Sequence, residues 1–508
     1  MSMSETARKW IQKLKTCDHG IVVLVILFLM TLPLINPMLR SDGIGYYAYV
    51  RSFVIDGDLE FRNEWAVARD DDITNPEFLK SDSLFYPRLN INPEYYETTA
   101  TGLTPNRYSV GLSMLWAPFF LTAHGLVHVL RFLGSSVSAD GYSRPYIWLC
   151  AFGSAFYGLM ALIQSYWIGR RFFSRKTVLF STIICWFATS LLCYMYALPL
   201  TKHAAGFFLV AALIYLSMKI RDQQRFWHWP VIGMILAFFV MINPMNGIFT
   251  LCLLPAFIDD IKRHLWKRIF KNFIAVVAVF CIFLIPHVMI GRLLYGRVVL
   301  QFMKVAIGDR TMSRLFTMQW HSPHFLDVLF SSKHGLFTWT PVVFPAVLGL
   351  IMFMRKSPVT GIILTGCFIG VVYFLGCTHV WFQGSSFGGR QFVSHTATFI
   401  LGMAAFVEGI RRVVPRLVII LSGCIVICWN AAFILQFGLG LIPRMDYILW
   451  PEMISNQFTV VPAFLFNRGM TFVHFYPILI CIGLLFAAGV VALGVICRRH
   501  IQLYIREL

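Results

Sequence analysis

Residues 20–39 read GIVVLVILFLMTLPLINPML, and residues 40–49 continue RSDGIGYYAY. A helix needs about 20 apolar residues to cross a bilayer, so the first stretch has the composition and length of a transmembrane helix. A basic segment, 1–19, precedes it, and no small-residue cleavage site follows. We therefore predict a retained first transmembrane helix over 20–39, a cytoplasmic N-terminus over 1–19, and an outer face that begins at residue 40.

The composition of the whole chain supports a membrane protein. Of its 508 residues, 58% are hydrophobic and 13% are charged, whereas soluble domains carry about 25% charged residues. These values exclude a disordered, collagen-like or disulfide-scaffold protein. None of the 12 cysteines lies in the polar stretch 40–107 and no CxxC pair occurs, so neither structural disulfides nor a zinc knuckle is predicted.

Apolar runs recur along the chain and predict about 12 transmembrane helices, with a range of 11–13. The positive-inside rule sets their orientation, because short basic connections stay in the cytoplasm. This assignment places most of the +19 net charge on the inner side. The positive charge is therefore explained by the orientation of the chain in the membrane, and no nucleic-acid partner is expected. The predicted spans are 20–39, 145–169, 177–199, 203–220, two within 230–258, 272–291, 335–354, 358–377, 391–408, 417–437 and 471–496.

Two apolar runs are ambiguous. The run 109–133 contains Pro118, His124, His128 and Arg131, and we predict an interfacial helix there that does not cross, because the turn after the next span is strongly basic and should be cytoplasmic. The run 230–258 is interrupted by the sequence NPMNG and has basic residues on both sides. We predict two short tilted helices that form a hairpin, with both flanks inside.

The resulting fold class is an all-α polytopic membrane protein with a large outer first loop that contains juxtamembrane helices. We expect one membrane domain over 1–508. Its parts are the outer loop 40–144, the transmembrane core 145–437, a second outer loop 438–470, the last span 471–496 and a cytoplasmic tail 497–508.

The first candidate functional residue is Asp42, the first carboxylate after the first span. Gly43 and Gly45 follow it and permit close approach of the backbone. Tyr46, in the same motif, is a candidate substrate contact. The alternative interpretation is structural: Asp42 caps the next helix by accepting backbone N–H bonds.

Cations gather at other predicted outer ends. Lys202 and His203 lie between two spans, and ionisable groups at membrane depth are functional candidates by default. His334 lies in KHGLFTWTP and Arg390 in SFGGRQF. An aromatic belt with snorkelling cations is the alternative explanation for these segments, although it accounts poorly for the glycines around Arg390.

Other motifs carry less information. Gly384–Gly388 matches G-x-S-x-G, but a loop between apolar helices lacks the strand–turn–helix context of a nucleophile elbow. His124 and His128 have i,i+4 spacing without a zinc-protease signature, which favours an interfacial role. Asp56 and Asp58 suit a hard cation, although Asp-Gly-Asp is also an ordinary turn.

The four candidate segments fall on one predicted side of the membrane. One carboxylate and several cations suit group transfer from a phosphate-linked donor: the cations stabilise the phosphate as a leaving group, and the carboxylate deprotonates the acceptor hydroxyl. With one evident base and no partnered nucleophile, direct displacement with inversion is the economical mechanism for a sugar.

At these residues the chain resembles the GT-C superfamily of integral membrane glycosyltransferases, in particular bacterial relatives of the protein O-mannosyltransferases and aminoarabinose transferases. The resemblance implies that Asp42 is the catalytic base or acceptor-positioning acid. It also implies that Arg107, in TGLTPNRYSVG, approaches a lipid phosphate, and that 109–133 skirts the membrane. His334 and Arg390 match outer-end motifs of some bacterial members.

One departure from the family concerns metal binding. Many relatives carry a second acid where this chain has Lys202 and His203. No metal ligand is therefore assigned and no cofactor is certain, although a divalent cation stays open. His203 is expected to contact donor phosphate or acceptor.

The expected function is that of an inverting glycosyltransferase of the inner membrane. It would move a sugar from a polyprenyl-phosphate donor to an unknown acceptor (lipid, glycan or protein) on the outer side, among membrane lipids. The alternatives are a transporter or lipid-linked-sugar flippase, which predicts broken helices around a midplane site, and a non-catalytic assembly subunit.

Overall fold

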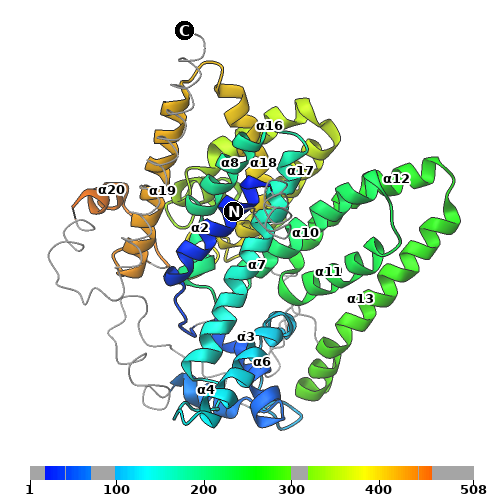
Figure 1. The fold of residues 1–508 in the computed structure, drawn as a ribbon, viewed down its shortest axis with the longest axis vertical. Coiled ribbons are helices and arrows are strands. Elements are labelled where there is room, and N and C mark those ends of the chain that lie inside the picture. The colour runs from blue at the N-terminus through cyan, green and yellow to red at the C-terminus, as the bar shows by residue number, and fades with distance from the viewer. Residues whose placement is uncertain (1–17, 41, 70–97, 299–317, 444, 460–508) are drawn as a thin grey trace, which may run out of the picture.

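The computed structural model describes residues 18–40, 42–69, 98–298, 318–443 and 445–459, and every regular element in these ranges is helical (Figure 1). The predicted last span 471–496 lies outside the described residues. The helices are α2 (His19–Thr31), η1 (Leu32–Leu34), α3 (Asp42–Arg51), η2 (Ser52–Asp56), α4 (Arg62–Arg69), α6 (Gly111–Phe132), α7 (Arg144–Arg170), α8 (Arg175–Phe187), α9 (Ser190–Leu192), η4 (Cys193–Ala197), α10 (His203–Asp222), α11 (His228–Ile242), η5 (Pro244–Leu253), α12 (Leu254–Lys262), α13 (Trp266–Tyr295), α14 (Phe325–Phe330), α15 (Leu336–Trp339), α16 (Val343–Lys356), α17 (Pro358–Gly376), η6 (Arg390–His395), α18 (Thr396–Ile410), α19 (Arg416–Gly438) and α20 (Trp450–Phe458).

Many of these helices have the length and composition of membrane spans. The described residues contain eight such helices, or nine if the bent pair 175–187 and 190–197 counts as one span. His19–Leu34 and His228–Ile242 are apolar but shorter. The all-helical, multi-pass character predicted from the sequence is therefore confirmed, whereas the predicted number of 12 spans is not confirmed by the described residues.

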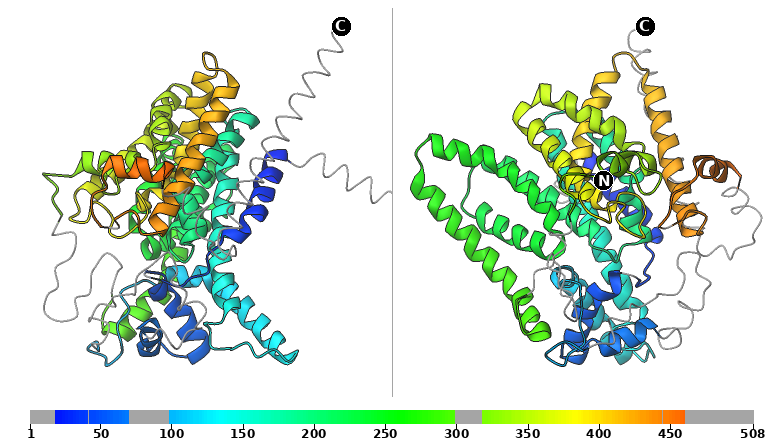
Figure 2. Two further views of the ribbon diagram at one scale, coloured as in Figure 1. Left: turned by 90° about the vertical axis from the view of Figure 1, so that its left-hand side faces the viewer. Right: turned by 180° about the vertical axis from the view of Figure 1, so that it is seen from behind.

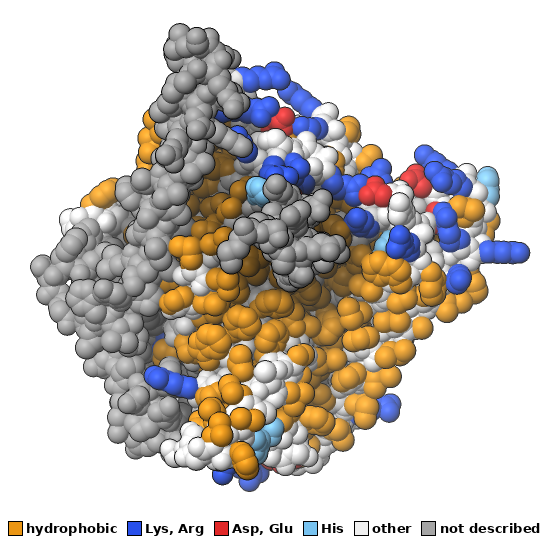
Figure 3. Space-filling view, in the orientation of Figure 1, with side chains coloured by type: hydrophobic (Ala, Val, Ile, Leu, Met, Phe, Trp, Pro, Cys, Tyr) orange, Lys and Arg blue, Asp and Glu red, His pale blue; other side chains and the backbone are white. Residues whose placement is uncertain are grey.

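The basic ends of the helices gather at one end of the bundle. Figure 3 shows Lys and Arg side chains along the upper edge and hydrophobic side chains over the middle. Short connections that are far apart in the sequence meet at this end through polar contacts. These contacts are Arg171 to Asp222 (2.5 Å), Gln224 to Asp260 (3.2 Å) and Lys356 to Glu408 (3.0 Å).

The run 230–258 folds as the predicted hairpin. α11 ends at Ile242, and the chain turns at Asn243 into η5 and α12. The contact between Gln224 and Asp260 brings the two flanks of the run together. Pro244 lacks an N–H and disfavours helical backbone in the preceding residue, which explains why the break falls at Asn243.

The predicted span 177–199 is broken. Its two parts, 175–187 and 190–197, are inclined by 63°. The Asn430 side chain, on α19, donates to the carbonyls of Phe187 (2.9 Å) and Thr189 (3.0 Å). Backbone carbonyls within a membrane need such partners, so Asn430 stabilises the bend.

Below the bundle, α3, α6 and the first half of α7 pack together (Figure 2). Arg51 ties the end of α3 to α4 through Glu64, at 2.9 Å. Tyr47 donates to the carbonyl of Gly141, before α7. The sequence prediction placed an interfacial helix at 109–133. The observed α6 also has the length and composition of a span.

Candidate functional site

Asp42 is the first residue of α3, and other side chains engage both of its carboxylate oxygens. The Tyr108 hydroxyl donates to Oδ1 at 2.9 Å, and Arg390 Nη1 donates to Oδ2 at 3.3 Å. The helix-cap interpretation therefore does not account for the carboxylate, because within the described residues its hydrogen bonds come from distant side chains. Asp42 instead joins three segments: its own at the start of α3, that of Tyr108 before α6, and that of Arg390 at the start of η6.

The glycines after Asp42 allow this junction to form. A Cβ atom at position 43 would overlap the carbonyl oxygen of Leu200, and one at position 45 would overlap the ring of Tyr108. Only glycine lets α3 approach both neighbours so closely. The motif DGIG thus places Asp42 against the 198–201 turn and within reach of the Tyr108 hydroxyl.

The loop before Arg390 is held by Tyr194. The Tyr194 hydroxyl accepts the N–H of Phe387 (3.0 Å) and donates to the carbonyl of the same residue (3.2 Å). The Gln383 side chain accepts the N–H of Gln391 at 2.8 Å and closes the loop. Because Tyr194 lies in η4, beyond the bend in the broken span, that bend positions the loop which carries Arg390.

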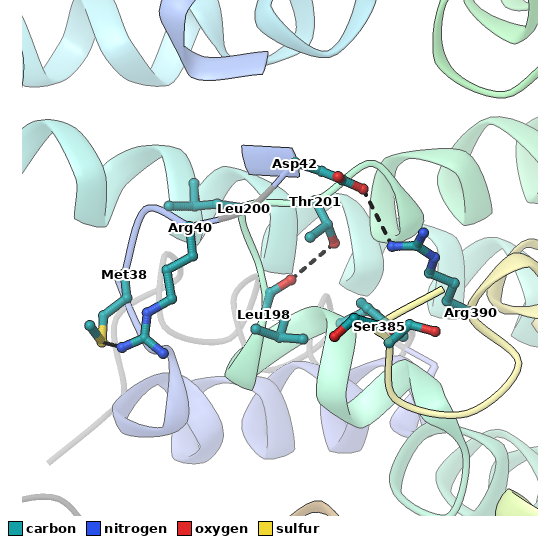
Figure 4. A pocket seen from close by; sticks show the side chains of 10 residues that line it. Met38, Arg40, Asp42, Leu198, Leu200, Thr201, Ser385 and Arg390 are labelled. Carbon is teal, nitrogen blue, oxygen red and sulfur yellow. Dashed lines mark hydrogen bonds and ion pairs between the residues drawn. The ribbon is translucent and has the colours of Figure 1, made fainter. Parts of the chain in front are cut away.

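A pocket opens between these segments, with about 420 Å³ of empty space, part of it open to solvent (Figure 4). One carboxylate and two guanidinium groups line the pocket. The lining residues are Met38, Arg40, Asp42, Tyr194, Leu198, Leu200, Thr201, Ser385, Ser386 and Arg390.

Arg390 has donor capacity beyond its ion pair with Asp42. Its Nε atom is buried and has no hydrogen-bond partner among the described residues. A buried donor without a partner costs about 1–3 kcal/mol, which an anion or a polar ligand in the pocket would recover. Arg40 lines the same pocket and contacts the sulfur of Met38.

Arg107 and Tyr46 reach Asp42 through Tyr108. Arg107 Nη2 donates to the Tyr108 hydroxyl at 3.0 Å, and the Tyr46 ring lies edge-on to the Tyr108 ring, with centroids 4.9 Å apart. Arg107 is exposed and Tyr46 is buried. Burial raises the pKa of Tyr46 far above its ordinary value, so this phenol stays neutral.

The remaining predicted site residues do not line the pocket. His203 is buried behind Tyr194, with ring centroids 4.6 Å apart, and Lys202 precedes it at the start of α10. His334 is stacked on Trp339, with ring centroids 4.5 Å apart. The structure therefore brings Asp42 and Arg390 together and leaves His334 in an aromatic cluster.

Several residues that line the pocket were not predicted from the sequence. Arg40 lies two residues before Asp42, and Ser385 follows Gly384 in the G-x-S-x-G match, so both lie inside motifs that drew attention for other reasons. Tyr194 sits in an apolar run and gave no signal, because its role depends on the bend at 188–189. Thr201 precedes the Lys-His pair and was passed over as part of a turn.

The described residues contain no group of three or more His, Cys, Asp or Glu side chains suited to a metal ion. The pocket instead offers one carboxylate, two arginines and several hydroxyl groups. These groups suit an anionic ligand together with a second ligand that has a hydroxyl group. No protein-family model matches the chain, and no curated protein matches its sequence.

Proposed function

We propose that the chain is an inverting glycosyltransferase that uses a polyprenyl-phosphate sugar as donor. The observation that carries this proposal is the pocket in which Asp42 lies 3.3 Å from Arg390 and which Arg40 also lines. A carboxylate and guanidinium groups are the acid–base and phosphate-binding groups that such a transfer requires.

The position of the pocket along the helices supports an outer active site. α10 starts beside the pocket at His203 and ends at Asp222, in contact with Arg171 of the basic end. Its 20 residues span about 30 Å, the thickness of the hydrocarbon core. By the positive-inside rule the basic end faces the cytoplasm, so the pocket faces the outside of the inner membrane.

The transfer uses Arg390 and Asp42 in sequence. The donor phosphate binds Arg390 and draws its guanidinium away from Asp42, which frees Oδ2. The acceptor oxygen then attacks the anomeric carbon opposite the phosphate, while the bond from that carbon to the phosphate oxygen breaks with its electron pair on the phosphate. Asp42 takes the acceptor proton, and the guanidinium balances the charge on the leaving phosphate.

A transporter or lipid-linked-sugar flippase is the second candidate. Two broken helices favour it, one bent at 188–189 and one interrupted at Asn243. The Asn243 side chain reaches Gln391, next to Arg390, at 3.2 Å. Such breaks around an interior site are common in transporters.

One experiment separates the two candidates. Purified full-length protein is incubated in nanodiscs with a panel of polyprenyl-phosphate monosaccharides and cell-envelope acceptors, and released polyprenyl phosphate is quantified by mass spectrometry. Release with a matching glycosylated acceptor supports the transferase. Substrate movement across proteoliposomes without any covalent product supports the transporter and contradicts our proposal.

A further inference from the structure

Two histidines lie close together on α6, outside the pocket described above. His124 Nε2 and His128 Nε2 are 3.2 Å apart, and the two rings are nearly perpendicular. Residues four apart share one face of a helix. His128 is exposed on the protein surface and His124 is half-buried.

The other nitrogen of His124 is already engaged. Its Nδ1 atom lies 2.7 Å from the hydroxyl of Tyr146, which is buried on α7. A hydrogen bond at one imidazole nitrogen fixes the tautomer and ring orientation, and it leaves the second nitrogen to act as a ligand. Histidines that bind metals have this arrangement almost without exception.

The separation of the two Nε2 atoms fits one shared ion. Two metal–nitrogen bonds of about 2.0–2.1 Å that meet at a tetrahedral angle place their nitrogens about 3.3–3.4 Å apart, close to the observed 3.2 Å. We propose that His124 and His128 form a binding site for a borderline divalent cation such as Zn²⁺, Ni²⁺ or Cu²⁺, with Tyr146 orienting His124. Water completes the coordination.

The ligand type sets the expected selectivity. Imidazole nitrogens suit zinc, nickel and copper, whereas magnesium and calcium prefer oxygen ligands. At a given site Cu²⁺ binds more tightly than either Ni²⁺ or Zn²⁺. Since Tyr146 belongs to α7, a bound ion also fastens α6 to α7. The site is independent of the pocket at Asp42.

The test is isothermal titration of tag-free, full-length protein in detergent with NiCl₂ alone and with MgCl₂ alone. We expect saturable binding of one Ni²⁺ and no binding of Mg²⁺. His128→Ala changes an exposed side chain and should abolish this binding, as should His124→Gln. Tyr146→Phe should weaken it about 10- to 100-fold, the usual effect of removing a partner of a metal-bound histidine.

His321→Ala is the matched control, because His321 is exposed and lies far along the chain from α6; it should bind Ni²⁺ like the wild type. Unchanged Ni²⁺ affinity in both His128→Ala and His124→Gln overturns the proposal. So does equal binding of Mg²⁺ by the wild type, which indicates an oxygen-ligand site elsewhere. Thermal unfolding of each variant confirms that the loss of binding is not a loss of fold.

Discussion

The guanidinium of Arg390 lies 3.3 Å from the carboxylate of Asp42, although 348 residues of chain separate them. The two side chains are partly exposed to the pocket, at 24% and 31%. Because both side chains line the pocket, a ligand that enters it would exchange with one member of the pair. In our account that ligand is the donor phosphate.

Replacement of Arg390 tests this exchange. Arg390→Lys keeps the positive charge but loses the planar fork of donors that matches a phosphate. Hydrogen bonds to charged groups contribute about 1.5–3 kcal/mol, so kcat/KM for the donor should fall about 10- to 100-fold, mainly through KM. Steady-state kinetics with a varied donor concentration measures this. Arg411→Lys, at the basic end, is the control and should have the wild-type kcat/KM. A wild-type KM in Arg390→Lys contradicts the role of Arg390 in binding the phosphate.

The close contact between Gly45 and the ring of Tyr108 can be tested by changing each residue separately. Gly45→Ala places a Cβ in the ring of Tyr108 and should displace this ring from Asp42. Tyr108→Phe removes only the hydroxyl that donates to Asp42 Oδ1. We expect a much larger loss of transfer activity for Gly45→Ala than for Tyr108→Phe, with both proteins folded by circular dichroism. Equal activity of Gly45→Ala and wild type is incompatible with the observed packing.

The bend in the broken span depends on Asn430. Asn430→Leu leaves the carbonyls of Phe187 and Thr189 without their donor, and an unpaired buried group costs about 1–3 kcal/mol. The midpoint of thermal unfolding should fall by several degrees. Cys424→Ala changes an exposed residue of the same helix and should leave the midpoint unchanged. If the two variants unfold at the same temperature, Asn430 does not stabilise the bend.

Glu64 gives the region around α3 and α4 a pH dependence. Burial raises its pKa from 4.5 to about 7, although Arg51 opposes the shift. Between these two values the folded state holds a proton that the unfolded state releases, so the stability contributed by this proton is complete below about pH 4.5 and is lost as the pH rises to about 7. The size is roughly 3 kcal/mol.

The measurement compares unfolding midpoints of wild type and Glu64→Gln from pH 5 to pH 8. The wild type should lose stability over pH 5–7 relative to the variant, and the difference should level off above pH 7. Glu452→Gln, at an exposed position of α20, controls for a generic charge effect. If the unfolding midpoints of wild type and Glu64→Gln change in parallel with pH, the pKa of Glu64 is not raised by folding.

Much of the helical architecture was predictable because lipid imposes strong constraints on the sequence. Apolar length indicated the spans, and Pro244 together with basic flanks indicated the hairpin at Asn243. The bend at 188–189 was not predictable. No proline or glycine marks it, and its partner, Asn430, lies more than 200 residues away and is visible only in the folded chain.

The candidate site was predictable in part for the same reason. Topology placed Asp42 and Arg390 at one end of the bundle, and the glycines after Asp42 indicated a close approach. Which cations reach the carboxylate depends on loop conformation. His334, which was also predicted at an outer end, stacks on Trp339 instead. Tyr194 and Arg40 enter the pocket through packing between segments that are distant in the sequence.

The central claim is that Asp42 is the base of the transfer, and the rate of polyprenyl-phosphate release tests it most directly. Asp42→Asn keeps the shape and a hydrogen-bond acceptor but removes the base, so release should fall about 10²- to 10⁴-fold. Asp140→Asn is the matched control, because an amide oxygen still accepts the N–H groups of Tyr142 and Ser143. Release by Asp42→Asn at the wild-type rate, with normal expression and folding, would contradict the account.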